Sequence, residues 1–251
     1  MFPSKLYKNS KYWVSPIINE ELEMMDKDKN PVFKNAEAEY YLAIKNNEIV
    51  GRIAGIVNWV EVKEQKKNKV RFGWYDVIDD IEVSKKLLDA VIQFGKEREL
   101  SFIEGPVGFS NMDKAGLLTH GFNELNTMIT WYHNPYQKEH LEKLKMKKLA
   151  EWVEYRIQIY SEKDAPKKVK KFSNLIMKRY NLKALNFKKT KDLVPYMDEM
   201  FDLLNKTYNT LQTFVPIQQY QIDHYKERYL RYIHPEFIKS VADKDGNLVA
   251  F

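Results

Sequence analysis

Two stretches of the sequence, LAIKNNEIVGR at residues 42–52 and VADKDGNLVAF at residues 241–251, carry the same pattern. With Ala43 placed over Ala242, each stretch reads as a strand, a two-residue turn and a returning apolar strand. The turns are Asn46-Asn47 and Asp245-Gly246, and both pairs tolerate the positive φ that two-residue hairpin loops require. The sequence therefore predicts one β-hairpin that is written twice in the chain.

The residues around each hairpin predict a longer series of elements. After the first hairpin, Asp80 is a suitable cap for a helix whose apolar residues recur at helical spacing. A helix that links two strands indicates a mixed α/β sheet with at least one parallel pair. The expected strands cover residues 37–58 as a hairpin, 70–78, 101–105, 147–160, 185–188 and a second hairpin within 237–251, and the expected helices cover 80–98, 134–144, 191–208 and 217–232.

Composition narrows the class of protein. Hydrophobic residues make up 44% of the 251 residues, which is typical of a globular chain, and there are no cysteines. Disulfides, thiolate catalysis and cysteine-bound zinc are thereby excluded, and the composition suits a reducing cytoplasm. The start lacks the apolar core of a signal peptide, and IVGRIAGIVNWV is too short to span a bilayer, so we expect a cytoplasmic protein with no membrane partner. The five histidines show no metal-ligand spacing, and no metal site is predicted.

Positive charge is concentrated in one segment. Residues 163–192 contain eleven Lys or Arg and two Asp, whereas the whole chain has a net charge of +6. A basic block of this kind attracts phosphate-rich partners such as nucleic acid. The alternative is a solvated helix face, because Val169, Phe172 and Leu175 recur at helical spacing between the lysines. The sequence favours the solvated face and leaves nucleic-acid binding through 163–192 as an alternative.

The sequence contains four motifs: FPSKLY at 2–7, VGRIA at 50–54, GPVGFS followed by GLLTHGF within 105–122, and NPYQ at 134–137. Together they resemble bacterial proteins with two tandem domains of the GNAT superfamily of N-acetyltransferases. The resemblance implies a GNAT-like mixed central sheet flanked by helices. Residues 1–160 then form a near-complete domain without its first strand, 161–182 a basic helical linker, and 183–251 the first half of a second GNAT-like domain. On this interpretation the chain is a fragment.

The resemblance implies an acyl-CoA-dependent N-acyltransferase that uses acetyl-CoA as co-substrate. The amine of a small molecule or peptide attacks the thioester directly. The cofactor candidates are Val77, Ser84, Lys85 and Asn134. The sequence departs from the family at the phosphate loop, where residues 77–84 contain no glycine and carry Asp79, Asp80 and Glu82. Glycines let backbone N–H groups approach a diphosphate at a helix N-terminus, and carboxylates repel it.

A second departure lies in the fourth helix of the pattern, where Leu141 falls at the place of the usual tyrosine acid. Tyr136 is the candidate that replaces it, and Asp76, near the end of its strand, is the candidate base. Amphipathic packing and ion pairing are the alternatives for these two residues. The long loop from Gly105 to Thr130 is the expected substrate-binding segment, since loops of this length are often functional. Its candidate residues are Ser110, Asn111, Asp113 and His120.

Two other functions stay open at this point. The acidic phosphate loop and Leu141 also suit a non-catalytic GNAT-like module that binds a metabolite or a protein partner. An aminoacyl-tRNA-dependent transferase is the third hypothesis, because such enzymes also pair two GNAT-like domains and the basic segment suits tRNA.

Overall fold

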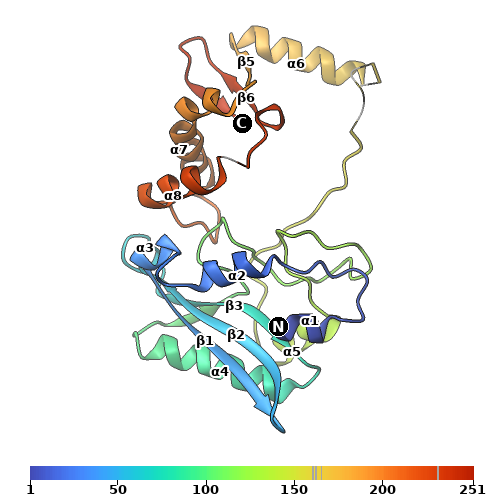
Figure 1. Cartoon of the computed structure of the whole chain (residues 1–251), viewed down its shortest axis with the longest axis vertical. Helices are drawn as coiled ribbons and strands as arrows, with labels where there is room; N and C mark the ends of the chain where they lie inside the picture. The colour runs from blue at the N-terminus through green and yellow to red at the C-terminus, as the bar shows by residue number, and fades with distance from the viewer. Residues whose placement is uncertain (160, 162, 165, 231) are drawn as a thin grey trace. The chain divides into compact units, whose positions relative to one another are not determined.

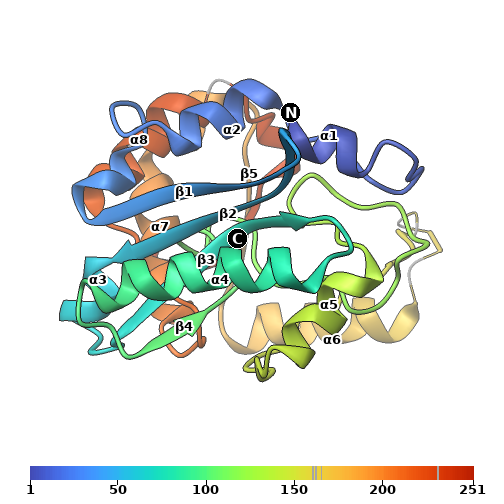
Figure 2. The ribbon, with the colours of Figure 1, turned by 90° about the horizontal axis from the view of Figure 1, so that it is seen from below.

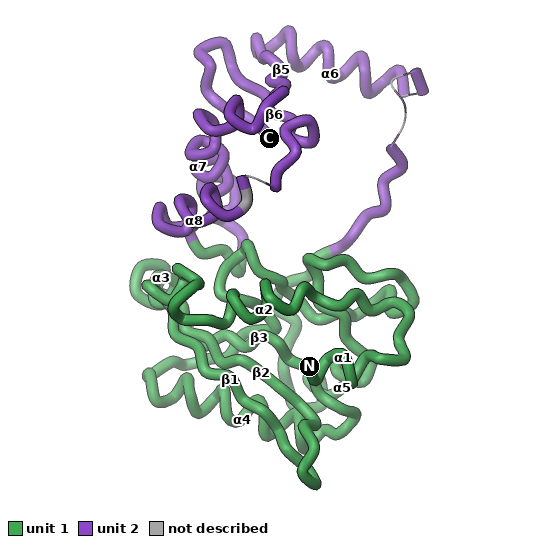
Figure 3. Tube along the Cα trace, in the orientation of Figure 1, with its two compact units in different colours: residues 1–152, 212–215 green, residues 153–211, 216–251 purple. Residues whose placement is uncertain are grey.

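The computed structural model describes residues 1–159, 161, 163–164, 166–230 and 232–251, and it has a mixed α/β fold (Figure 1). The chain divides into two compact units (Figure 3). Unit 1 contains Met1–Trp152 and the short segment Gln212–Val215, and unit 2 contains Val153–Leu211 and Pro216–Phe251.

Unit 1 is built on a four-stranded sheet with the order β1-β2-β3-β4. The first three strands are antiparallel, and β4 runs parallel to β3, so the predicted parallel pair is confirmed. The elements are α1 (Phe2–Leu6), α2 (Ile18–Met25), η1 (Pro31–Lys34), β1 (Ala36–Lys45), β2 (Glu48–Asn58), α3 (Trp59–Lys63), β3 (Lys69–Val77), α4 (Ile81–Lys96), β4 (Phe102–Glu104) and α5 (Pro135–Lys143).

The first predicted hairpin is confirmed as β1 and β2. Its turn residues, Asn46 and Asn47, both have positive φ, at 52° and 61°. Asn accepts this conformation at lower energy than most residues because its short polar side chain bonds locally, and a two-residue hairpin loop needs it.

Helix α4 covers one face of the sheet (Figure 2). The predicted cap is confirmed, because the Asp80 side chain accepts a hydrogen bond from the Glu82 amide. The buried stripe of α4 includes Val83, Leu87 and Val91, as the spacing predicted. The opposite face carries a second cluster around Trp74, which holds the β1 end of the sheet against η1 and the long loop.

Four charged side chains form a buried cluster at the start of β3. Lys69 Nζ lies 2.8 Å from Glu61 Oε1 and 2.7 Å from Glu104 Oε1, and Arg71 Nε lies 2.8 Å from Glu61 Oε2. The guanidinium of Arg71 also donates to the carbonyls of Gly108, at 3.1 Å, and Thr213, at 3.0 Å. The negative charges of the two carboxylates offset the positive charges of Lys69 and Arg71. The hydrogen bond from Arg71 to Thr213 attaches the 212–215 segment to unit 1.

Unit 2 has a three-stranded antiparallel sheet with the order β5-β6-β7. The second hairpin is confirmed as β6 and β7, with Gly246 at a φ of 91° in its turn. The elements of this unit are α6 (Lys167–Arg179), β5 (Lys183–Asn186), η2 (Thr190–Asp192), η3 (Val194–Tyr196), α7 (Met197–Tyr208), α8 (Gln219–Tyr229), η4 (Pro235–Phe237), β6 (Lys239–Ala242) and β7 (Leu248–Ala250).

The strand predicted at 147–160 was wrong for every residue of it that the structure describes. Residues 147–159 have no strand, and Tyr155 and Ile157 are 80% and 79% exposed. Residue 160 lies outside the described residues. The segment has the alternating residues of a strand, but its described residues pair with no strand, and a strand exists only as part of a sheet.

The basic segment forms the predicted helix, α6, but none of its residues is buried. Val169, Phe172 and Leu175, which the sequence placed on one apolar stripe, are each more than half exposed.

Candidate active site

The candidate site lies along the part of β3 that extends beyond its pairing with β4. The two strands pair only from Lys69 to Arg71, whereas β3 continues to Val77. Beyond this point the edge of β3 is met by other groups. The Val107 amide donates to the Phe72 carbonyl at 2.8 Å, and side chains of α5 reach the carbonyls of Tyr75 and Val77.

A β-bulge marks the middle of β3. Trp74 has a φ of 48°, and the register between β2 and β3 shifts between Arg52 and Ala54. Positive φ is strained for a bulky residue, and such strain persists where the surroundings fix it. Here the indole Nε1 of Trp74 donates to Glu21 Oε2 at 3.1 Å. Bulges of this kind occur often beside active sites, because they redirect the side chains that follow.

Asp76, the predicted base, follows the bulge and is buried. Its Oδ1 accepts a hydrogen bond from the Tyr7 hydroxyl at 2.8 Å, and its Oδ2 accepts one from Arg52 Nε at 2.7 Å. Arg52 Nη2 also lies 3.9 Å from Glu21 Oε2. Burial and the charge of Asp76 raise the pKa of Tyr7 well above its usual value, so the tyrosine stays a donor. Both oxygens of Asp76 are therefore held in place by partners.

Helix α5 places Tyr136 and Gln137 along the open edge of β3. Tyr136 Oη donates to the Val77 carbonyl at 2.8 Å and accepts from Asn134 Nδ2 at 3.1 Å. Gln137 Nε2 donates to the Tyr75 carbonyl at 3.0 Å, and its Oε1 accepts from the Asn134 amide at 2.7 Å. Burial raises the pKa of Tyr136, which makes it a poorer acid than a free tyrosine. Three predicted site residues, Val77, Asn134 and Tyr136, thus lie in one hydrogen-bonded group.

The predicted cofactor residues on α4 do not join that group. Ser84 is fully buried, where it accepts from the Tyr75 hydroxyl at 2.7 Å and lies 2.8 Å from His140 Nδ1. His140 Nε2 in turn lies 3.1 Å from Asp79 Oδ1. Lys85 is exposed and pairs with Asp89 at 2.6 Å. Ser84 therefore joins α4, α5 and β3 from inside the fold, and Lys85 bonds along its own helix.

The N-terminus of α4 already carries an anion. The carboxylate of Asp80 accepts from the Glu82 amide at 3.0 Å, and its Oδ2 lies 2.9 Å from Lys45 Nζ. The hydrogen bond from Lys45 lowers the pKa of Asp80, so this carboxylate is charged at neutral pH. A helix N-terminus binds anions through its free N–H groups, and here one of them is bound by the protein itself.

The long loop brings three of its four predicted residues together. The Asp113 carboxylate accepts from the Ser110 amide at 2.8 Å, and desolvation raises the pKa of Asp113 to about 6. Asn111 Oδ1 is buried and has no hydrogen-bond partner among the described residues. His120 is exposed and lies outside this turn.

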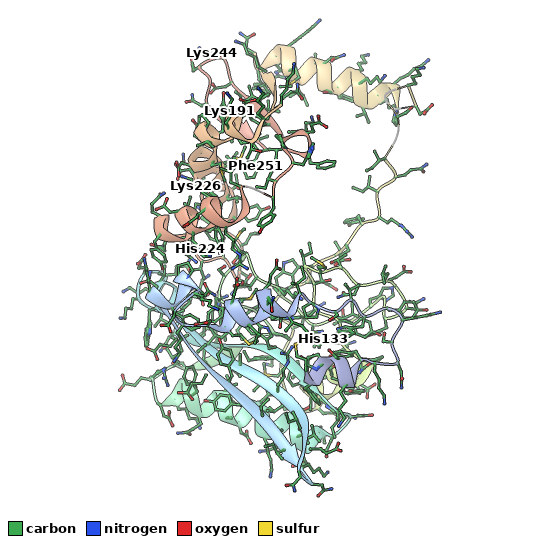
Figure 4. All side chains as sticks on the ribbon, in the orientation of Figure 1. His133, Lys191, His224, Lys226, Lys244 and Phe251 are labelled. Carbon is green, nitrogen blue, oxygen red and sulfur yellow. The ribbon has the colours of Figure 1, made fainter. Side chains whose placement is uncertain are left out.

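Sequence reasoning missed Tyr7, Glu21 and His133. Tyr7 ends the FPSKLY motif, so the motif was a usable signal for it. His133, labelled in Figure 4, is buried and accepts from the Leu118 amide at 3.2 Å through Nδ1. Burial lowers its pKa to about 4, and the ring is neutral at pH 7.

The chain is 26% identical over 254 residues to Protein YghO of Escherichia coli strain K12. The match covers this whole chain and 63% of YghO, so the chain spans less than two thirds of that relative. No protein-family model and no solved structure matches the chain. The similarity relates the two sequences and assigns no reaction to either.

Two features are absent from the described residues. No group of three or more acidic or histidine side chains is arranged to hold a metal ion in that part of the chain. None of its helices has the length and apolar character that crossing a bilayer requires.

Proposed function

We propose that the protein is an acyl-CoA-dependent N-acyltransferase that moves an acetyl group from acetyl-CoA to the amine of a small molecule or peptide. The observation that carries the proposal is the opening of the sheet beyond Arg71. A strand edge without a strand neighbour, a bulge at Trp74 and the buried carboxylate of Asp76 meet there. The GNAT-like motifs of the sequence point to the same architecture.

In the proposed reaction the amine nitrogen attacks the thioester carbonyl carbon. The C–N bond forms, the C–S bond breaks, and coenzyme A leaves as a thiolate. Asp76 is the base that takes the proton from the amine, and Arg52 holds its other oxygen, Oδ2, in place. The acceptor amine then takes the place of the Tyr7 hydroxyl at Oδ1.

Tyr136 acts in this scheme as a hydrogen-bond donor to the departing thiolate. A thiol has a pKa near 8.5, whereas the pKa of Tyr136 is raised above that of a free tyrosine, about 10. Full proton transfer from Tyr136 to the thiolate is therefore uphill, and solvent supplies the proton. In the structure this hydroxyl donates to the Val77 carbonyl, so the thiolate takes the place of that carbonyl as its acceptor, while Asn134 Nδ2 still donates to the hydroxyl oxygen.

One observation favours a second candidate, a non-catalytic GNAT-like module that binds a metabolite or a protein partner. Asp80 caps α4 with its own carboxylate and places a negative charge where a diphosphate would lie. Ser84 is buried and Lys85 is paired, so neither offsets that charge.

Calorimetric titration of acetyl-CoA into the 251-residue chain separates the two candidates. The matched variants are Asp80→Asn, which keeps the cap oxygen and removes the charge, and Asp89→Asn, which removes an exposed charge one helix turn beyond Lys85. Release of free thiol, followed with a panel of amines, measures turnover in the wild type and in Asp76→Asn.

Binding and turnover in the wild type, with turnover reduced about 10²–10⁴-fold in Asp76→Asn, support the transferase. If acetyl-CoA binds to Asp80→Asn but neither to the wild type nor to Asp89→Asn, then the carboxylate of Asp80 prevents binding. This result supports the non-catalytic module. Absence of binding in all three proteins, each shown to be folded by circular dichroism, contradicts the transferase for this chain.

A further inference from the structure

Among the described residues, no strand lies beside the outer edge of β1. In the sheet of unit 1, β1 pairs with β2 alone (Figure 2). Along this edge Tyr40, Leu42 and Ile44 point to one face and are 40%, 56% and 67% exposed. An unpaired edge with apolar side chains is a template for another strand, and proteins usually protect such edges with charges, prolines or bulges. From Tyr40 to Ile44, β1 has no charge or proline.

The internal repeat shows what kind of element fits there. The hairpin β6–β7 repeats β1–β2, with Ala242 at the place of Ala43. Two helices precede the hairpin in both units, and α7 contacts β7 as α1 contacts β2. In unit 2, however, the strand equivalent to β1 has a second neighbour, because β5 pairs antiparallel with β6.

The register of that pair can be carried over to unit 1. Lys183 lies opposite Ala242, and Asn186 lies opposite Lys239. With Ala242 placed over Ala43, the equivalent strand would run from Ala43 to Tyr40. This stretch includes two of the three exposed apolar residues of the edge, Tyr40 and Leu42, and ends next to the third, Ile44.

A groove runs beside the same stretch of β1. It has a volume of about 430 Å³ and is lined by residues 41–45 of β1 and by α4, including Val83, Leu87 and Ala90. Side chains of a strand alternate between its two faces, so one set from an added strand would lie over this groove and the other set beside Leu42 and Ile44. The groove and the edge therefore fit one ligand.

We propose that the edge of β1 from Tyr40 to Ala43 binds an extended peptide strand with the pattern of β5, aligned antiparallel to β1. The main-chain groups of β1 supply the hydrogen bonds, and the groove beside α4 takes alternate side chains. Continuing the register of β5 puts Leu182 opposite Ile44, so that these two apolar side chains lie on the same face of the sheet. This inference is independent of the proposed transferase activity.

The test uses a labelled synthetic peptide with the sequence NLKALNFK, residues 181–188, titrated into the full chain. We expect saturable binding, with slower amide hydrogen exchange in residues 40–44 on saturation. The control peptide carries proline at the position of Leu185, which removes one N–H and disfavours a paired strand, and it should not bind.

Two variants of the chain test whether the peptide binds at this edge. Leu42→Lys introduces a charge on the edge, and we expect it to weaken binding at least tenfold. Leu125→Lys makes the same change at another exposed leucine, in the long loop, and should not alter binding. Equal affinity for both peptides, or unchanged affinity in Leu42→Lys, overturns the proposal. So does a dimer in light scattering that protects residues 40–44 and dissociates in Leu42→Lys, since a second copy is then the occupant.

Discussion

Arg71→Met tests the buried charged cluster most directly. The guanidinium is 1% exposed and makes a two-point ion pair with Glu61, with Nε and Nη2 at 2.8 and 2.9 Å from its oxygens. Removing one partner of a buried pair destabilises a protein by about 3–5 kcal/mol, because the other charge stays buried. The carbonyls of Gly108 and Thr213 lose their donor as well, at about 1 kcal/mol each. We therefore expect the free energy of unfolding to fall by roughly 5–7 kcal/mol.

Urea unfolding followed by tryptophan fluorescence is the appropriate assay. All five tryptophans lie within Met1–Trp152, so the signal reports on unit 1. Lys67→Met is the control, because Lys67 Nζ is 3.9 Å from Glu61 and partly exposed, and its loss should change stability by about 1 kcal/mol or less.

The double variant Glu61→Leu/Arg71→Met separates charge balance from packing. It leaves Lys69 paired with Glu104, so it should be more stable than Arg71→Met alone. A loss of less than about 1 kcal/mol in Arg71→Met, or a double variant less stable than the single one, would refute this reasoning.

Three other predictions concern unit 1 and use the same fluorescence assay. The pKa of His133 is near 4 in the folded protein and 6.5 in the unfolded chain, so folding favours the neutral ring. About 3 kcal/mol of stability should therefore be lost as pH falls from 6.5 to 4. The variant His133→Gln should not show this loss. Asp113 has a raised folded pKa, so its ionisation should destabilise the protein by on the order of 2 kcal/mol as pH rises from about 4 to 6, and a wild type that does not weaken relative to Asp113→Asn over this range contradicts the desolvation of Asp113. Gly95→Ala should destabilise by about 1–3 kcal/mol, although alanine ordinarily favours a helix, because its Cβ would lie 2.7 Å from Val70 Cγ1; a stabilised variant would show that Val70 has room to move.

Local patterns predicted the local structure well. The turns Asn46-Asn47 and Asp245-Gly246 identified both hairpins, and Asp80 identified the start of α4, because turn chemistry and capping depend on neighbouring residues. The strand expected at 147–160 depended instead on pairing with a distant part of the chain, and residues 147–159 form no strand. The periodicity of a segment indicates that it is able to form a strand, but it does not indicate which other strand would pair with it.

The site was predictable only in part for a similar reason. Asp76 was singled out by its place near the end of β3, and Tyr136 by its place in α5. Their partners come from elsewhere in the chain, since Tyr7 bonds to a carboxylate 69 residues away. Ser84 was expected to face a phosphate and is instead enclosed by Tyr75 and His140, which no spacing within 77–84 indicates.

The 212–215 segment has a consequence for the order of events during synthesis. Residues 1–152 leave the ribosome first, and domains generally fold as they emerge. Here the carbonyl of Thr213, one of the acceptors of the Arg71 guanidinium, is made sixty residues after the rest of unit 1. Until that residue emerges, unit 1 holds a buried cation with one acceptor missing. Unit 1 therefore gains its full set of contacts only after Thr213 has been made.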